Sequence, residues 1–178
     1  MNNSMKRLSR LVNLLAKATN RVATWGLVIT GIAMSVAIFL QIIFRFVIYV
    51  PFPWSEELAR YLMIWMGMLG SAVALRHGRH IGVSIIVEQF PAPIQKWIVA
   101  GTQLAMIGFL GVVLKEGWTM AVFNASQNSP SMEIPMFYPY LAISAGALLM
   151  IIELAAGVLN DFFPTAAGVK RDMVSGAL

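Results

Sequence analysis

Two groups of charged residues bracket an apolar stretch near the middle of the chain. Glu56, Glu57 and Arg60 stand before it, and Arg76, Arg79 and two histidines stand after it. Fifteen uncharged residues separate Arg60 from Arg76. A helix that crosses the hydrocarbon core of a bilayer needs about 20 residues, each rising about 1.5 Å. The pattern therefore predicts a spanning helix whose depth is fixed by charges at both membrane surfaces.

The composition supports a membrane protein. Hydrophobic residues make up 58% of the chain and charged residues 12%, whereas a soluble domain has about 25% charged residues. A soluble chain of this length could not bury so much apolar surface. The net charge of +5 does not indicate nucleic-acid binding, because the Lys and Arg residues stand beside the apolar segments.

Hydropathy predicts an all-α integral membrane fold with four spanning helices. Their approximate limits are 22–50, 55–76, 94–123 and 137–161, and prolines punctuate the three connections. The spans form one domain over residues 22–163, and residues 164–178 form a short polar cytoplasmic tail.

The distribution of Lys and Arg predicts the orientation. Ten of these residues precede the first span, lie between the second and third spans, or follow the fourth, and three lie on the other side. The positive-inside rule then places both termini in the cytoplasm. Residues 1–21 combine a stripe of leucines with a basic face, which predicts an amphipathic helix on the membrane surface.

Charged residues at the outer ends of the first two spans form a candidate structural cluster. Arg45 could extend to the interface alone or pair with Glu56 or Glu57. The spacing of Glu56 and Arg60 also suits an i,i+4 ion pair. Both carboxylates begin a helix, where the backbone dipole favours them.

Glu153 is the one acid that hydropathy places inside the hydrocarbon. An intramembrane carboxylate is costly and indicates a specific partner. Arg76, at the inner end of the second span, could reach it. We therefore expect either an Arg76–Glu153 contact or a contact between Glu153 and another protein.

The sequence argues against catalysis and against a bound metal or haem. The chain has no cysteine and two histidines, His77 and His80, neither inside a span. It contains no glycine-rich phosphate loop, nucleophile elbow or paired catalytic carboxylates. We expect no catalytic residue, substrate-binding residue or cofactor in this chain.

Small residues recur at four-residue spacing on two spans. Gly67 and Ser71 lie on the second, and Ala142 and Gly146 lie on the fourth. Such pairs allow helices to approach closely inside a membrane. They could serve packing within the chain or packing on another protein.

The chain contains three distinctive motifs: WSEELARY at 54–61, RHGRHI at 76–81 and SPSMEIPM at 129–136, the last followed by YPY at 138–140. Together they resemble the small membrane subunit of tripartite ATP-independent periplasmic (TRAP) transporters. The similarity extends from the first span to the fourth. Ser84 departs from it, because many relatives have an acid there.

The resemblance implies a non-enzymatic role. The small subunit would be a scaffold for a large multi-spanning subunit, which holds the substrate and sodium sites and receives an organic acid from a periplasmic binding protein. Arg45, Glu56, Glu57 and Arg60 would organise the outer face, and Arg76, Arg79 and His80 would anchor the inner end of the second span. Ser129, Pro130, Glu133 and Pro135 would face the periplasm near the binding protein.

Two alternatives come from other functional classes. A self-sufficient homo-oligomeric transporter or channel would use Glu153 in its pathway. A membrane electron-transfer subunit would need haem ligands. The sequence does not distinguish sialic acid from a C4-dicarboxylate as the substrate of the complex, and it leaves the oligomeric state open.

Overall fold

A computed structural model describes residues 3–50, 53–78 and 92–162. Within these ranges, five helical elements follow one another: α1 (Asn3–Ile43), the short π-helix η1 (Phe44–Ile48), α2 (Pro53–Gly78), α4 (Ala92–Phe123) and α5 (Phe137–Phe162). Four segments are long and apolar enough to cross a membrane: Leu11–Ile48, Pro53–Arg76, Trp97–Phe123 and Phe137–Asn160. The four predicted spans are thus confirmed.

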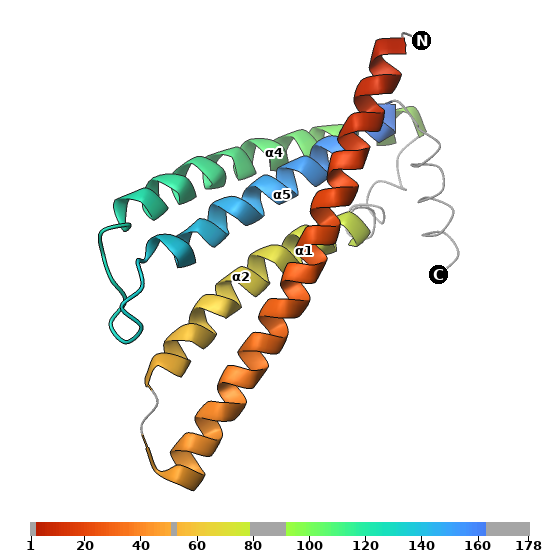
Figure 1. Ribbon diagram of the computed structural model, residues 1–178. Helices are drawn as coiled ribbons and strands as arrows, with labels where there is room; N and C mark the ends of the chain where they lie inside the picture. Colours follow the sequence, from red (N-terminus) through yellow and green to blue (C-terminus); the bar gives the residue numbers. More distant parts are fainter. Residues whose placement is uncertain (1–2, 51–52, 79–91, 163–178) are drawn as a thin grey trace.

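The helices form two antiparallel pairs, α1 with α2 and α4 with α5 (Figure 1). The pairs are joined mainly through α5, which packs against α4, α2 and α1. In its most apolar part 44% of the α5 residues are buried, against 6% for α1. Helix α5 is therefore the centre of the bundle.

Small side chains on α5 let its neighbours approach closely. Ala142, Ala147 and Ala156 are fully buried. A Cβ atom added at Gly146 would lie 2.6 Å from the Cβ atom of Met68 on α2, so glycine is required at this crossing. Ala142 and Gly146 therefore serve packing within the chain, whereas no atom lies within 4 Å of a Cβ built at Gly67 on α2.

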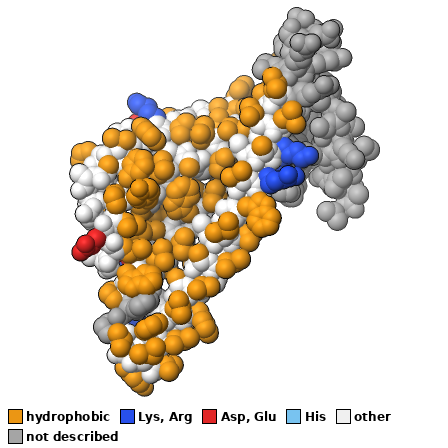
Figure 2. Space-filling view, in the orientation of Figure 1, with side chains coloured by type: hydrophobic (Ala, Val, Ile, Leu, Met, Phe, Trp, Pro, Cys, Tyr) orange, Lys and Arg blue, Asp and Glu red, His pale blue; other side chains and the backbone are white. Residues whose placement is uncertain are grey.

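Large apolar side chains cover much of the outside of the bundle (Figure 2). On α1, Ile29 and Phe39 are among those exposed, and on α4, Leu104 and Phe109 are. Such a surface is stable only against lipid or another apolar protein surface. The fold is consistent with a multi-pass membrane protein.

Helix α1 differs from the predicted division at residue 21. It continues without a break from Asn3 to Ile43, a length of about 60 Å at 1.5 Å per residue. This exceeds the hydrocarbon thickness of about 30 Å. Ala16 and Ala23 are both buried, so the N-terminal part of α1 packs on the bundle. A location of residues 1–21 along the membrane surface stays a prediction.

The first span ends in a local distortion instead of at Pro51. Residues Phe44–Ile48 form the π-helix η1, and Tyr49 follows with a positive φ of 58°. A π-helical turn holds an extra residue and re-aims the side chains that it carries. Arg45 lies within this turn.

Candidate functional site

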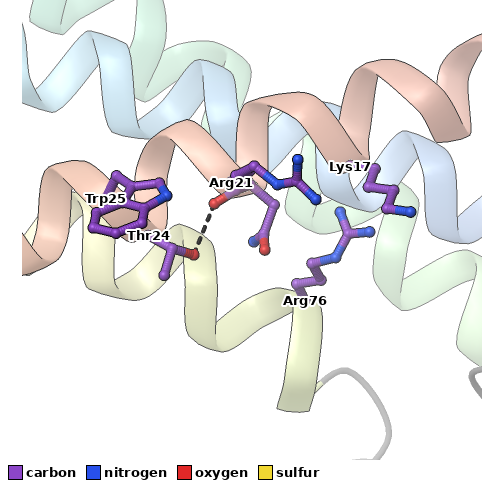
Figure 3. Close-up of a pocket in the computed structure, with 6 residues that line it drawn as sticks. Lys17, Arg21, Thr24, Trp25 and Arg76 are labelled. Carbon is purple, nitrogen blue, oxygen red and sulfur yellow. Dashed lines mark hydrogen bonds between the residues drawn. The ribbon is translucent and has the colours of Figure 1, made fainter.

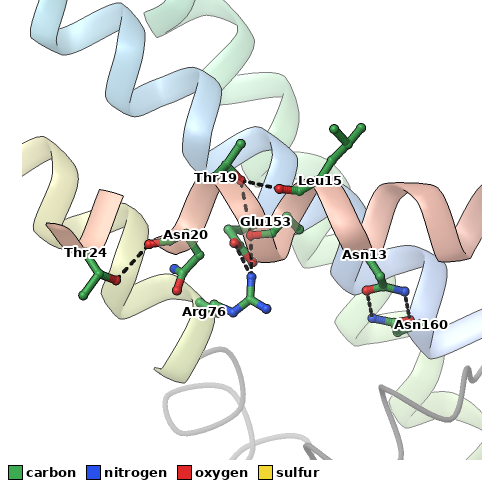
Figure 4. Close-up of polar contacts among 9 residues, drawn as sticks. Asn13, Leu15, Thr19, Asn20, Thr24, Arg76, Glu153 and Asn160 are labelled. Carbon is green, nitrogen blue, oxygen red and sulfur yellow. Dashed lines mark hydrogen bonds and ion pairs between the residues drawn. The ribbon is translucent and has the colours of Figure 1, made fainter. Parts of the chain in front are cut away.

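An ion pair joins α2 to α5 near the C-terminal end of α2. We call this end of the bundle the inner end, and the end with the start of α2 and the loop between α4 and α5 the outer end, after the predicted orientation. Arg76 Nη1 lies 2.7 Å from Glu153 Oε1, and the side chains are 13% and 3% exposed. The contact predicted from the lone intramembrane acid is therefore confirmed. Figure 4 shows both side chains between the helices that carry them.

The same guanidinium also reaches α1. Arg76 Nη1 donates a hydrogen bond to the backbone oxygen of Ala16 at 2.6 Å. The Ala16 residue is 1% exposed, and its small side chain permits this close approach. A single arginine thus ties three helices together, two through side chains and one through the α1 backbone.

A second polar contact reinforces the junction of α1 and α5. Asn13 and Asn160 exchange amide hydrogen bonds of 2.7 and 2.8 Å (Figure 4). Asparagine pairs between helices in an apolar setting satisfy both amides and fix the register of the helices. Together with the Arg76 contacts, this pair fixes the inner ends of α1, α2 and α5.

Glu57 organises the outer end. Its residue is 3% exposed, and its Oε2 atom accepts hydrogen bonds from the backbone N–H groups of Ser131 at 2.8 Å and Met132 at 3.1 Å. The Tyr61 hydroxyl donates to Oε1 from one turn further along α2 and lies 3.2 Å from Met136 Sδ. The start of α2 therefore holds the loop between α4 and α5 in place.

The loop also closes on itself. Asn128 and Pro135 form a β-bridge, and Ser129 N donates to Ile134 O at 2.9 Å. Ser129 is buried and its hydroxyl accepts a hydrogen bond from Ile134 N. Pro130 and Glu133 are exposed. Glu133 has a positive φ of 54°, a left-handed conformation that is uncommon outside glycine. The hydrogen bonds within the loop therefore hold Pro130 and Glu133 in defined, exposed positions.

For Arg45, the alternative without a carboxylate partner agrees with the structure, and the suggested Glu56–Arg60 pair is absent among the described residues. Among the described residues, the ion pairs are Arg76–Glu153 and Lys115–Glu116. Glu56 Oε1 accepts a hydrogen bond from Gln41 Nε2 at 2.8 Å, and so bonds to α1 instead of to Arg60. Arg45 lies 5.6 Å from the ring centroid of Phe46, which is a cation–π geometry. Its place in the exposed turn η1 explains why it does not reach α2.

Several contacts had weak or no sequence signals. Tyr61 follows Glu57 by four residues, a spacing that places both on one helix face. Nothing in the sequence pairs Asn13 with Asn160, because they are far apart in the chain. Arg79 and His80, the other predicted anchors, lie outside the described residues. In the ranges that the structure covers, no group of three or more His, Cys, Asp or Glu side chains could hold a metal ion.

We expect Arg76 and Glu153 to be energetically coupled. Replacing either one with Gln leaves a buried charge unpaired, which costs about 3–5 kcal/mol for a buried pair. The loss in unfolding free energy of the double variant Arg76→Gln/Glu153→Gln should be smaller than the sum of the two single losses, by about 1 kcal/mol or more. Unfolding in detergent measures the three values, with Lys115→Gln as the control from an exposed pair. Strictly additive losses would rule out the coupling.

We also expect Glu57 to stabilise the loop between α4 and α5 and to slow hydrogen exchange at its backbone amides. In Glu57→Ala, the N–H groups of Ser131 and Met132 lose their acceptor, with a loss of about 1–3 kcal/mol. Hydrogen exchange at these two amides should become faster. The matched control is Glu56→Ala, whose side chain is exposed and bonds to Gln41 only among the described contacts. Equal exchange in both variants would contradict a specific role for Glu57.

Comparisons with known proteins agree with this arrangement. The C4-dicarboxylate TRAP transporter small permease protein of Rhodobacter capsulatus is 32% identical over 54% of this chain and 44% of its own length. A putative TRAP transporter small permease protein of Haemophilus influenzae is 26% identical over 77% of this chain and 86% of its own length. The sialic acid TRAP transporter permease protein of Haemophilus influenzae is 31% identical over 61% of this chain, but over 17% of its own length.

The family model for the DctQ component of tripartite ATP-independent periplasmic transporters matches residues 34–163. This range begins in the membrane part of α1 and includes α2, the outer loop and α5. It therefore contains the Arg76–Glu153 pair and the contacts of Glu57 with the loop, whereas Asn13 and Ala16 lie before it. The chain belongs to the DctQ component family of tripartite ATP-independent periplasmic transporters.

Proposed function

We propose that this chain is a rigid scaffold that holds the large transport subunit of a TRAP transporter in the membrane. The observation that carries the proposal is the placement of its polar contacts. Arg76, Glu153 and the Asn13–Asn160 pair lie at one end of the bundle, and Glu57 with its loop lies at the other. Polar links at both ends resist sliding of the helices past one another.

The middle of the bundle does not resemble a transport path. A path for ions or organic acids needs broken helices or several polar side chains at similar depth. Among the described residues, the buried polar side chains are scattered and do not gather at one depth: Ser55 and Glu57 at the start of α2, Ser129 in the loop, Ser144 and Glu153 in opposite halves of α5, and Gln103 in the first half of α4. A transporter component of this kind is not an enzyme, and its substrate and sodium sites would belong to another subunit.

The exposed apolar surface suits a partner in the membrane. Side chains such as Phe39 on α1 and Phe109 on α4 are more than 60% exposed. The sialic acid permease protein matches this chain over 17% of its length, so in that relative a similar segment is joined to a much larger protein. We infer that a separate large multi-spanning subunit covers part of this surface here.

The transported compound would be an organic acid. Two of the relatives described above are named for a C4-dicarboxylate and for sialic acid, which are both carboxylates. Other similar proteins are named for isethionate, a sulfonate, and for ectoine. A periplasmic binding protein would deliver the acid to the outer face, and a sodium gradient would drive uptake across the bacterial inner membrane. Sodium ions would bind the large subunit and not this chain.

Affinity purification of the full chain from its native membrane in mild detergent tests the scaffold. We expect a stoichiometric large membrane protein in the eluate, identified by mass spectrometry, and no uptake by vesicles that contain this chain alone. Recovery of a homo-oligomer that transports by itself would overturn the proposal in favour of a self-sufficient carrier. A visible haem spectrum would overturn it in favour of electron transfer.

The outer loop supplies a second test. Glu133 is exposed on a loop that Glu57 holds, so charge reversal there should disturb docking without disturbing the fold. When the concentration of binding protein limits transport, Glu133→Lys should lower uptake by the whole complex, by up to about tenfold. The reason is that a charge at the rim of an interface acts mainly on the rate at which the two proteins associate. Glu116→Lys on α4 is the control for an exposed acid. Unchanged uptake in Glu133→Lys would exclude this loop from the docking face.

A further inference from the structure

A groove of about 320 Å³ opens between α1 and the inner end of α2 (Figure 3). Its lining consists of Lys17, Asn20, Arg21, Thr24, Trp25 and Arg76. The first five recur at three- and four-residue steps and therefore share one face of α1. Arg76 faces them from α2 (Figure 3).

The groove carries an excess of positive charge. Lys17, Arg21 and Arg76 meet there, and Arg76 is already paired with Glu153. Within the described part of the chain, neither Lys17 nor Arg21 takes part in an ion pair. Like charges at i and i+4 repel, so an anion between these two cations would relieve an unfavourable interaction. Figure 2 shows Lys and Arg side chains gathered over the N-terminal half of α1, beside an otherwise apolar surface.

Asn20 adds an unused hydrogen-bond donor. Its Nδ2 atom is buried and has no hydrogen-bond partner among the described residues. Figure 4 places this side chain beside Arg76. A buried amide without a partner is costly. Asn20 lines both the groove and a small closed space beside Glu153, so a turn of its side chain would bring Nδ2 to a phosphate oxygen in the groove. Thr24 also lines the groove, although its hydroxyl already donates to Asn20 O at 2.8 Å.

The surroundings favour a lipid over a free anion. Trp25 lines the groove and is 64% exposed, and tryptophan is enriched where headgroups meet hydrocarbon. Val22, Val28 and Ile29 continue the exposed apolar surface of α1. A free phosphate ion would leave these side chains unused, whereas the acyl chains of a phospholipid would cover them. Basic pockets between membrane helices bind anionic headgroups in this way.

We propose that this groove binds the phosphate of an anionic phospholipid, with Lys17 and Arg21 on the headgroup and Trp25 at the level of the glycerol backbone. Arg76 lines the groove while keeping its bond to Glu153. The bound lipid would lie against both α1 and α2 and would link their inner ends. The proposal is independent of the transport role and of the partner subunit.

Native mass spectrometry of the full chain in detergent tests the groove. Phosphatidylglycerol and phosphatidylcholine of the same acyl length are added separately, and the fraction of protein that retains lipid gives the affinity of each. We expect tighter binding of phosphatidylglycerol and a loss of about tenfold or more in Lys17→Gln/Arg21→Gln, since each surface cation contributes about 1 kcal/mol. Both side chains are exposed, so the variant should fold, and circular dichroism checks its helix content.

A matched double variant separates the groove from general attraction. Lys6→Gln/Arg7→Gln removes the same charge from α1 at least about 15 Å further along the helix axis from Lys17, and should retain phosphatidylglycerol like the parent chain. Equal losses in the two double variants would overturn the proposal, because they would indicate a diffuse effect of charge. Displacement of phosphatidylglycerol by millimolar inorganic phosphate would also overturn it, because the ligand would then be a free anion.

Discussion

The bonds of Arg76 are the constraint on which the rest of the bundle depends. A guanidinium and a carboxylate in apolar surroundings each carry a large desolvation cost, and this cost is offset only when they meet with good geometry. Arg76 meets Glu153 on α5 and the Ala16 carbonyl on α1. The helices cannot slide relative to one another without breaking one of these bonds. Small residues such as Gly146 then allow α2 and α5 to pack closely above this fixed point.

The outer end follows a different principle. Glu57 binds the backbone of the loop between α4 and α5 instead of a basic side chain. Backbone N–H groups exist at every residue but proline, so this link depends on the shape of the loop more than on its sequence. The two ends therefore connect α5 to the other pair of helices in complementary ways. At the inner end, the buried Arg76–Glu153 pair links α2 to the second half of α5. At the outer end, Glu57 binds the loop that leads into α5, and so links α2 to the start of that helix.

Sequence reasoning succeeded where only one physical solution was available. Long uncharged stretches predicted four spanning helices, and a lone acid at membrane depth indicated a basic partner, found in Arg76. It is less informative at the outer interface, where several polar groups compete. There the sequence leaves two alternatives open for Arg45, which lies over Phe46, and Glu56 bonds to Gln41 instead of to Arg60. The WSEELARY and SPSMEIPM motifs both carry the family resemblance, but the sequence does not predict their link through Glu57, because backbone donors leave no trace in a sequence.

The continuity of α1 connects the inner junction with the basic N-terminal segment of the chain. An amphipathic pattern over residues 1–21 does not specify whether the helix bends along the bilayer or continues straight. In the structure, Asn13, Ala16 and Ala23 face the bundle. Lys17 and Arg21 therefore lie on the exposed side of α1. Arg76 is paired with Glu153, whereas Lys17 and Arg21 have no ion-pair partner among the described residues. The unpaired positive charge in the groove therefore lies on α1. The contacts that hold α1 in the bundle thus also determine the side of α1 on which Lys17 and Arg21 are exposed.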